Sequence, residues 1–379
     1  MSNPLVQKRE DRVQVLRYAA PPSEWDRWLA STPYSAGLCQ STYWATVVEK
    51  LDHANPIFLG VVGEDQESPV ASLLAFHRKP WVRHRQRRNL KAFLTGAWRG
   101  WIEWQHGPAI FRNERDQALC VQAYDLLLDW LEEFRRKRRL RCIRCGGFPP
   151  SSPFADDERI RDLFINKGYT VNRWGTFLVD LEQTEEALWQ GGLNRSTRRN
   201  VKKARKAGLT VSGIMTFDDY EQRFERNFCA FHERPTLETL PRALRAVTWD
   251  EDRHGYYKYF VSEAAGGEVL ATLGMYMFNG VATEIASSLS PRAIAEKLPA
   301  QDLLHWEMLL RAKAEGCHTF DLAGVNPDPQ DPKEAGIRRF KEKWGGRYAE
   351  YNSFTKDVST PGARLVKALS GRKLHAERD

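Results

Sequence analysis

Two distant segments of the chain share one pattern, and this repetition limits the fold more than any other feature of the sequence. Residues 123–147 (AYDLLLDWLEEFRRKRRLRCIRCGG) and 300–324 (AQDLLHWEMLLRAKAEGCHTFDLAG) align without a gap. Each predicts an amphipathic helix, a turn, and a short apolar strand that stops at a glycine. A hairpin-like region precedes each segment, and Asn279-Gly280 in the second is typical of a two-residue hairpin turn. The repeated order therefore predicts two α/β units of the same kind.

The length and charge of the chain bound its size and its partners. It has 379 residues, enough for two ordinary domains, and 42% of them are hydrophobic. The formal net charge of +8 at pH 7 favours an anionic partner, such as nucleic acid, a phosphorylated metabolite or a lipid head group. No apolar run approaches the ~20 residues that cross a bilayer, and the N-terminus lacks a hydrophobic signal core. We therefore expect a cytoplasmic protein without a transmembrane segment, with at most peripheral contact to an anionic membrane.

Familiar cofactor and metal motifs are absent from the sequence. It contains no G-x-x-x-x-G-K-[ST], no G-x-G-x-x-G after a strand, no H-E-x-x-H and no G-x-S-x-G. The histidines do not cluster with cysteine or carboxylate at metal-ligand spacing, and Cys142 and Cys145 lack the second pair that a zinc site needs. The sequence therefore predicts neither a metal nor a resident cofactor.

Residues 193–207 predict a strongly basic helix. Leu193, Thr197, Val201 and Ala204 form one apolar stripe, and Gly208 supplies a stop. The stretch from residue 195 to residue 206 contains no Asp or Glu. Its seven cations are Arg195, Arg198, Arg199, Lys202, Lys203, Arg205 and Lys206. Like charges this close repel one another. The helix therefore either binds the phosphates of a nucleic acid or nucleotide, or presents a solvated face at a domain junction.

A second basic segment, GIRRFKEKWGG (336–346), sets cations around two aromatic residues. On a helical wheel Ile337, Phe340 and Trp344 share one face, which predicts packing on a core. The cations are Lys341 and Lys343 near the edge of this face, and Arg338 and Arg339 further out. The wheel alone does not decide which of the two lysines would reach an anion.

Three stretches resemble the Fem-type aminoacyltransferases. They are QSTYWA (40–45), RSTRRNVKKARKAGLTV (195–211) and AKAEGCHTFDLAGVNPDPQDPKEAGIRRFKEKWGG (312–346). The order and spacing of F-D-L-x-G and R-F-K-x-x-W-G-G is the most specific part. The resemblance implies two tandem acetyltransferase-like (GNAT-like) domains, and transfer of an amino acid from aminoacyl-tRNA to an amine, most often on a peptidoglycan precursor.

On this basis we expect an α/β (α+β) fold with three parts. Residues 1–175 form a first GNAT-like domain, residues 176–355 a second one with the basic helix 193–207 at the junction, and residues 356–379 a basic tail. Two features depart from the family pattern. No charged heptad-like insert lies between Val211 and Tyr256, so the long helical arm of several family members should be missing. No Q/R-x-x-G-x-G/A loop precedes the helix at Ala300, which disfavours acetyl-CoA as donor.

The resemblance also implies a site. It matches Phe340-Lys341 to the family's Phe-Lys near the acyl acceptor, and so prefers Lys341 as the cation for a substrate phosphate or a developing oxyanion. Asp321 and Gly324 should border the same cleft, where Asp321 either accepts the amine proton or makes a structural hydrogen bond. Glu284 stands where the family has an aromatic strand, so the acceptor pocket should differ. The other predicted substrate-binding residues are Arg338, Arg339 and Trp344, and the predicted tRNA- or phosphate-binding residues are Arg195, Arg198, Arg199, Lys202, Lys203 and Lys206.

The predicted function is therefore an aminoacyltransferase with aminoacyl-tRNA as co-substrate and no other cofactor. The acceptor is an amine-bearing molecule, nucleotide-linked or peptide: a cell-wall precursor by default, a peptide-like or aminoglycoside-like natural product otherwise. Two alternatives remain open. One is an N-acyltransferase that uses acyl-CoA or an acyl carrier, and the other is a non-catalytic RNA-binding module.

Overall fold

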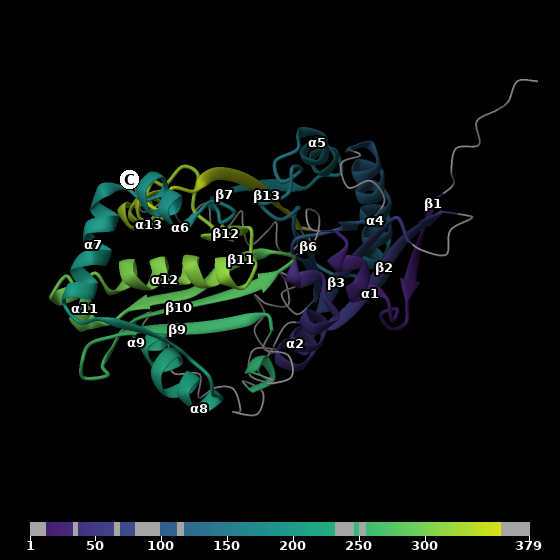
Figure 1. Cartoon of the computed structure of the whole chain (residues 1–379). Helices are drawn as coiled ribbons and strands as arrows, with labels where there is room; N and C mark the ends of the chain where they lie inside the picture. Colours follow the sequence, from purple (N-terminus) through teal and green to yellow (C-terminus); the bar gives the residue numbers. More distant parts are fainter. Residues whose placement is uncertain are drawn as a thin grey trace, which may run out of the picture. The chain divides into compact units, whose positions relative to one another are not determined.

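The structure is a computed structural model that describes residues 13–32, 37–63, 69–79, 99–111, 117–231, 246–249 and 255–357. The chain divides into two compact units, one formed by Met1–Asn172 with Asn352–Asp379 and the other by Arg173–Tyr351. Both are mixed α/β, as predicted, and Figure 1 labels their helices and strands. The assignment to domains 1–175 and 176–355 with a tail from 356 stays a prediction, and residues 358–379 of that tail lie outside the described residues.

The sheet of the first unit has the strand order β1-β2-β3-β4-β6-β13. Neighbours from β1 to β4 are antiparallel, β4 and β6 are parallel, and Ser353–Asp357 of β13 runs antiparallel to β6. The short strand β5 pairs with β3. The bounds are β1 (Val13–Tyr18), β2 (Asn55–Gly63), β3 (Ala71–Arg78), β4 (Trp101–Trp104), β5 (Ala109–Ile110), β6 (Cys142–Gly146) and β13 (Arg347–Asp357).

The first predicted helix-strand segment is present as α4 and β6. The helix α4 buries Tyr124, Leu127, Leu128 and Leu131, which recur at i, i+3, i+4 and i+7 and so form one face. That face packs with the strands in one hydrophobic core. The helices of this unit are α1 (Trp25–Ala30), η1 (Leu38–Gln40), α2 (Thr42–Asp52), α4 (Gln117–Arg138) and α5 (Glu158–Asn166).

The sheet of the second unit has the order β7-β12-β11-β10-β9-β8. β8 to β11 are antiparallel neighbours, β11 and β12 are parallel, and β12 is antiparallel to β7. Asn279 and Gly280 have φ values of 48° and 74°, so they form the predicted hairpin turn between β10 and β11. The bounds are β7 (Thr170–Asp180), β8 (Thr210–Gly213), β9 (Tyr257–Glu263), β10 (Val269–Phe278), β11 (Val281–Leu289) and β12 (Thr319–Asp321).

Helices cover both faces of the second sheet. α12 packs on β9 and β10, along which it lies in Figure 1, and α7 packs on α12. A separate core on the other face joins η4 to β9, and α9 contacts β10 and β11. The bounds are α6 (Glu185–Ala187), η3 (Leu188–Gly192), α7 (Arg195–Lys206), α8 (Phe217–Asp219), η4 (Tyr220–Glu225), α9 (Arg226–Phe231), η6 (Ala246–Trp249), α11 (Pro291–Ala295), α12 (Ala300–Ala314) and α13 (Pro332–Glu342).

The prediction for the basic helix is confirmed, whereas that for α12 is only half right. α7 begins after Asn194, whose side chain caps it, and its predicted stripe Thr197, Val201 and Ala204 is fully buried. α12 was expected to be amphipathic, but it is buried on nearly every side. The reason is that α7 covers the side of α12 that faces away from the sheet.

The prediction for residues 337–344 is partly wrong. Trp344 is fully buried, but Ile337 is 41% exposed. The helix α13 ends at Glu342, so Trp344 lies beyond it and its direction no longer follows the wheel.

The long helical arm is missing from the described part of residues 211–256, where the longest helical stretch covers 217–231. Among the described residues, no helix combines the length and the apolar character needed to cross a membrane.

Candidate active site

The parallel strands of the second unit separate at their carboxyl ends. Pairing between β11 and β12 stops at Thr283 and Asp321. β11 then carries a bulge, with Ala286 at φ 50° and a register shift against β10. In open α/β sheets ligands bind outside the carboxyl ends of the strands. Asp321 and Glu284, which stand at this separation, therefore mark the candidate site.

Asp321 is held in place at the end of β12. Its side chain is 5% exposed, and its Oδ1 accepts hydrogen bonds from Thr176 Oγ1 at 2.5 Å and from the Ala323 backbone N–H at 2.8 Å. The pKa of Asp321 is raised overall, because the effect of burial exceeds the opposing effects of the two hydrogen bonds and of the charge of Lys341. A carboxylate with a raised pKa is a stronger base than a solvated one, so Asp321 suits proton transfer as well as structure.

Glu284 lies buried between β11 and α12, where it pairs with His305. Glu284 Oε2 and His305 Nε2 are 3.3 Å apart, and their side chains are 7% and 1% exposed. Burial alone would raise the pKa of Glu284, but His305, Lys341 and Ser287 outweigh it and lower that pKa. The carboxylate is therefore stabilised in its charged form inside the core.

His305 is fixed at both ring nitrogens. Its Nδ1 lies 2.9 Å from the Gln301 carbonyl oxygen and 3.2 Å from the Gln301 side-chain nitrogen. Its Nε2 makes the contact with Glu284 Oε2 described above. The ring stacks on Trp344 at 5.1 Å between centroids and meets Phe340 edge-on at 5.0 Å.

Lys341 comes from the last turn of α13 and reaches the separation of the strands. Its Nζ donates a hydrogen bond to the Gly324 carbonyl oxygen at 3.3 Å. Its charge lowers the pKa of both Asp321 and Glu284. Four residues that the sequence analysis assigned to the site thus meet at the separation of the strands: Lys341, Asp321, Glu284 and Gly324.

Lys343 is used differently. Its Nζ lies 2.6 Å from Asp302 Oδ1, and both side chains are less than one-fifth exposed. The ammonium also lies 3.9 Å from the centre of the Phe340 ring. Burial lowers the pKa of Lys343, and Asp302 opposes this. These contacts make Lys343 a structural cation that ties α13 to the start of α12.

The other predicted substrate-binding residues do not converge on the carboxylates. Arg338 is half-buried: it donates to the Pro327 carbonyl oxygen at 2.6 Å, and its guanidinium lies 4.7 Å from the centre of the Tyr348 ring. The prediction that it points outward is therefore wrong, because loop and strand neighbours hold it. Phe340 and Trp344 instead form the aromatic wall against His305.

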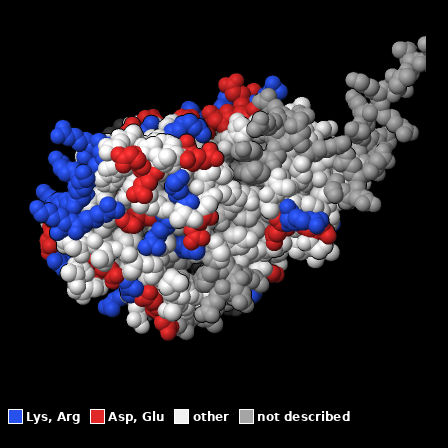
Figure 2. Space-filling view, viewed as in Figure 1, with Lys and Arg blue, Asp and Glu red and all other residues white. Residues whose placement is uncertain are grey.

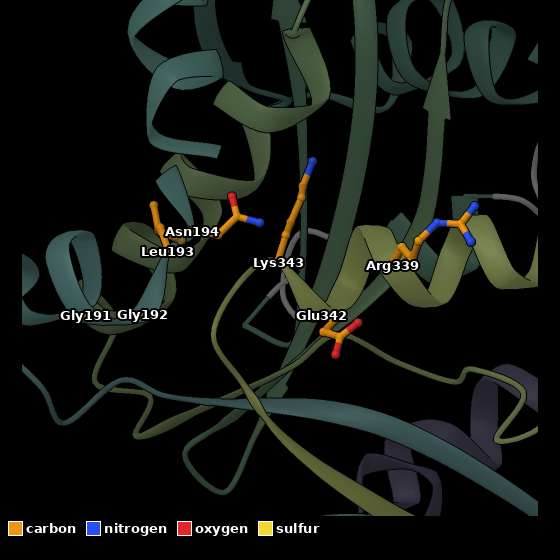
Figure 3. A pocket seen from close by; sticks show the side chains of 7 residues that line it. All are labelled: Gly191, Gly192, Leu193, Asn194, Arg339, Glu342 and Lys343. Atoms are coloured by element: carbon orange, nitrogen blue, oxygen red, sulfur yellow. The ribbon is translucent and has the colours of Figure 1, made fainter. Parts of the chain in front are cut away.

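Arg339 lines a separate, open pocket of about 450 Å³ at the start of α7. Its lining residues are Gly191, Gly192, Leu193, Asn194, Arg339, Glu342 and Lys343. Figure 3 shows Arg339 and Glu342 extending in different directions from Lys343. Because Lys343 pairs with Asp302 and Glu342 adds an acid, the pocket is only weakly suited to an anion.

The cations of α7 fall into two groups. Arg198 Nη1 donates to the carbonyl oxygens of Trp189 at 3.1 Å and of Gln190 at 2.9 Å, so it belongs to the local fold. Arg205 pairs with Glu307 at 2.9 Å, and Lys202 lies 5.9 Å from the centre of the Trp189 ring.

The second group faces solvent without acidic partners in the described part of the chain. Figure 2 shows cations gathered over α7, at the left of the view. The exposed members without a recorded ion pair are Arg195, Arg199, Lys203 and Lys206. Their spacing places them along one side of a helix of 12 residues, which is about 18 Å long. This surface can follow a row of phosphates.

The sequence analysis missed several residues of the site. His305, Thr176 and Tyr351 all adjoin its carboxylates, and burial together with Asp321 raises the pKa of Tyr351. Only His305 gave a signal, as a polar residue inside the apolar run DLLHWEMLL. Within the described ranges, no group of three His, Cys, Asp or Glu side chains could hold a metal.

Comparison with known proteins supports the predicted α/β fold with GNAT-like domains. The acetyltransferase (GNAT) domain model matches residues 194–342. No curated protein matches the sequence.

Three solved structures share the fold at low sequence identity. FemX has a TM-score of 0.68 at 14% identity and covers 93% of this chain and 99% of its own. A tandem GNAT protein from the clavulanic acid biosynthesis pathway has a TM-score of 0.55 at 11% identity, over 92% of this chain and 99% of its own. L-PGS from Bacillus licheniformis has a TM-score of 0.51 at 10% identity, over 91% and 95%. Residues 194–342 therefore match an acetyltransferase (GNAT) domain model, and nearly the whole chain shares its fold with FemX and with a tandem GNAT protein.

Proposed function

We propose that this protein is an aminoacyltransferase that moves an amino acid from aminoacyl-tRNA to an amine and so forms an amide. The observation that carries the proposal is the ammonium of Lys341 beside the buried carboxylates of Asp321 and Glu284, where β11 and β12 separate. The Fem-like motifs and the fold shared with FemX support the same reaction class.

The chemistry follows from this arrangement. The acceptor amine attacks the ester carbonyl, an N–C bond forms, and negative charge develops on the carbonyl oxygen. Lys341 stabilises that charge in a half-buried setting. The amine proton passes to Oδ2 of Asp321, since the hydrogen bonds from Thr176 and Ala323 both reach Oδ1. The C–O bond then breaks, and the ribose oxygen leaves with the proton that Asp321 returns.

The surface of α7 supports a polynucleotide as donor. Its four exposed cations, which pair with no acid in the described part of the chain, suit phosphate contacts, and such contacts dominate the affinity of proteins for nucleic acids. No metal or other cofactor is needed for this reaction, and we propose that it takes place in the cytoplasm. The acceptor is proposed to be a peptidoglycan precursor, or an amine-bearing natural product of peptide type.

An acyl-CoA-dependent N-acyltransferase is the second candidate, because the matching family model is that of an acetyltransferase domain. The start of α12 argues against it. Backbone N–H groups at a helix start are the usual cradle for a pyrophosphate. In α12 the first residues, Ala300, Gln301 and Asp302, are buried, and Asp302 brings a negative charge that holds Lys343.

The experiment that tests the proposal separates the donors. Purified protein is incubated with total charged tRNA and a panel of amine acceptors, and products are followed by mass spectrometry. We expect an amide product that ribonuclease treatment of the donor mixture abolishes, without release of free coenzyme A. Product formed from acyl-CoA without RNA would support the second candidate, and absence of product from either donor would favour a non-catalytic RNA-binding module.

A further inference from the structure

Trp174 is an exposed aromatic side chain on β7, the strand that also carries Thr176, a hydrogen-bond donor to Asp321. It lies in β7 and is 43% exposed, whereas the residues from Gly175 to Val179 that follow it are buried. Alternate residues of a strand point to the same face. Trp174 therefore shares a face with Thr176, whose hydroxyl donates to Asp321 at 2.5 Å.

The indole also borders the residue that Lys341 contacts. A Cβ placed on Gly324 would lie 3.8 Å from Trp174 Cε3 and 3.1 Å from Tyr351 Oη. The carbonyl oxygen of the same Gly324 accepts the hydrogen bond from Lys341 Nζ. Trp174 and Lys341 are thus both in reach of one peptide group.

The backbone next to Trp174 is held by a pair of hydrogen bonds and by a covering ring. Gly175 donates to the Val325 carbonyl oxygen at 2.9 Å, and Val325 donates back to Gly175 at 2.7 Å. The Tyr348 ring covers Gly175 so closely that no side chain would fit there. Trp174 therefore stands on a rigid strand, and its exposure does not come from a loose chain.

A rigid, exposed indole beside an ammonium and a carboxylate suits a planar ring that is attached close to the reacting group. In aminoacyl-tRNA the base of the terminal adenosine and the aminoacyl ester are carried by one ribose. In acyl-CoA the adenine is separated from the thioester by a pyrophosphate and the pantetheine arm. Bases stack on aromatic side chains through their faces, whatever their sequence.

We propose that Trp174 is the stacking platform for the adenine of the donor's 3′-terminal adenosine, which places the ester carbonyl beside Lys341. The proposal rests on the proposed function, because it takes aminoacyl-tRNA as the donor. It assigns Trp174 a binding role and leaves the chemical step to Lys341 and Asp321.

Direct binding tests the stacking site without catalysis. The probe is 3′-amino-3′-deoxyadenosine acylated with glycine, in which an amide replaces the ester; a second probe has the same ribose without its base. Trp174→Ala should weaken binding of the first probe by about 5- to 150-fold, the range for one base on one aromatic side chain. Trp174→Phe should retain most of the affinity. The base-free probe should bind the wild type and Trp174→Ala equally and weakly.

Met215→Ala is the matched control, because Met215 is 81% exposed in the same unit and has no place at the site. It should bind the first probe like the wild type. Equal binding by Trp174→Ala and the wild type, or no binding by the wild type, overturns the proposal.

Transfer assays keep the two proposals apart. With charged tRNA, Trp174→Ala should raise the donor KM by a similar factor and change kcat only a few-fold. Transfer that is insensitive to Trp174 overturns the stacking site and leaves the proposed function intact. Base-dependent binding of the adenosine probe without transfer from any charged tRNA overturns the function and leaves the stacking site intact.

Discussion

The two units repeat one α/β motif, yet the matching positions carry different chemistry. In the gapless alignment of 123–147 with 300–324, Leu128 corresponds to His305. The same alignment matches Arg144 to Asp321. Because Arg144 pairs with Glu103 and Asp321 pairs with Thr283 in the neighbouring strands, the next residues, Trp104 and Glu284, are equivalent. Where the first unit buries Leu128 and Trp104, the second therefore buries a histidine and a glutamate.

The ends of the parallel strands differ as well. Arg144, which matches Asp321, is exposed, and its guanidinium lies 6.0 Å from the centre of the Trp101 ring. In the first unit the strands stay paired one residue further, to Trp104 with Cys145. The comparison teaches that the motif folds with an apolar core at these positions. The buried charges of the second unit are therefore not required by the fold, and perturbed carboxylates of this kind gather at functional sites.

Removing Lys341 should have the largest effect on turnover. Lys341→Met should lower kcat by about 10²- to 10³-fold, since it deletes a charge that stabilises the transition state. Steady-state kinetics with charged tRNA measures this, with circular dichroism to verify folding. Wild-type turnover in a folded variant would remove Lys341 from the mechanism.

Lys343→Met is the control for Lys341. It leaves Asp302 buried without its partner, so it should lower the free energy of unfolding by about 3 kcal/mol and spare kcat within a few-fold. A large loss of kcat at full stability would reverse the roles of the two lysines.

Replacing residues of the second unit by those of the first should show how much the buried pair of His305 and Glu284 contributes to the free energy of unfolding. His305→Leu installs the residue found at position 128 and strands the Glu284 carboxylate, so we expect a loss of about 3 kcal/mol in the free energy of unfolding at neutral pH. The double variant His305→Leu with Glu284→Gln should recover part of that loss. Urea unfolding measures both.

The pH dependence sharpens the same test. The pKa of Glu284 is lowered in the folded state, so its stabilising contribution is present above the ordinary value of 4.5 and is lost as the pH falls through the folded pKa. The variant that lacks both groups should not show this acid loss. If wild type and double variant share one pH profile, the pair does not stabilise the fold.

Asp321→Asn should lower kcat by about 10²-fold if Asp321 accepts the amine proton. In the wild type, kcat/KM should then rise with pH through the raised pKa of Asp321, and the variant should lack that limb. Unchanged turnover would assign Asp321 a structural role alone. Arg144→Asn, at the matching position of the first unit, is the control and should leave kcat unchanged.

Asp321→Asn should also change how the stability of the fold depends on pH, with the opposite sign to that expected for Glu284. A raised folded-state pKa stabilises the fold below the ordinary value of 3.8, and this stabilisation is lost as the pH rises through the folded pKa. Asparagine can still accept from Thr176 and Ala323 but does not titrate. The variant should therefore gain stability relative to the wild type as the pH rises, which thermal unfolding at several pH values measures.

The smallest expected effect concerns the two basic helices. The double variant Arg199→Gln with Lys203→Gln should weaken tRNA binding and reduce the slope of log affinity against log salt by up to about 1.5. The matched control in α4 is Arg136→Gln with Lys137→Gln, since Lys137 already pairs with Glu133 at 2.6 Å. Equal slopes in both variants would make α7 a solvated face.

The same α7 variant has a second diagnostic readout. If its cations hold the phosphates of a nucleotide-linked acceptor, the acceptor KM rises and the tRNA affinity stays unchanged.

Local sequence patterns predicted the elements better than the site. The stripe Thr197, Val201 and Ala204 and the turn at Asn279-Gly280 were read correctly, because each depends on neighbours a few residues away. Lys341 and Lys343 could be separated only by a family resemblance.

The missing parts of the site depend on pairings that no local pattern contains. The contact of His305 with Glu284 spans 21 positions, and that of Thr176 with Asp321 spans 145. The packing of α12 on β11 creates the first contact, and the pairing of β12 with β7 creates the second. The all-round burial of α12 likewise follows from the packing of α7 on it, which a helical wheel does not show.

The pairing of β13 with β6 has a consequence for synthesis. Cys145 and Phe354, which face each other in this pair, are 209 positions apart. A chain leaves the ribosome from its N-terminus, and domains generally fold as they emerge. Here the first unit to emerge must wait for nearly the whole chain before β6 gains its second neighbour, and until then β6 is an open edge on which other strands can pair. The first unit to be translated is therefore the last to be completed.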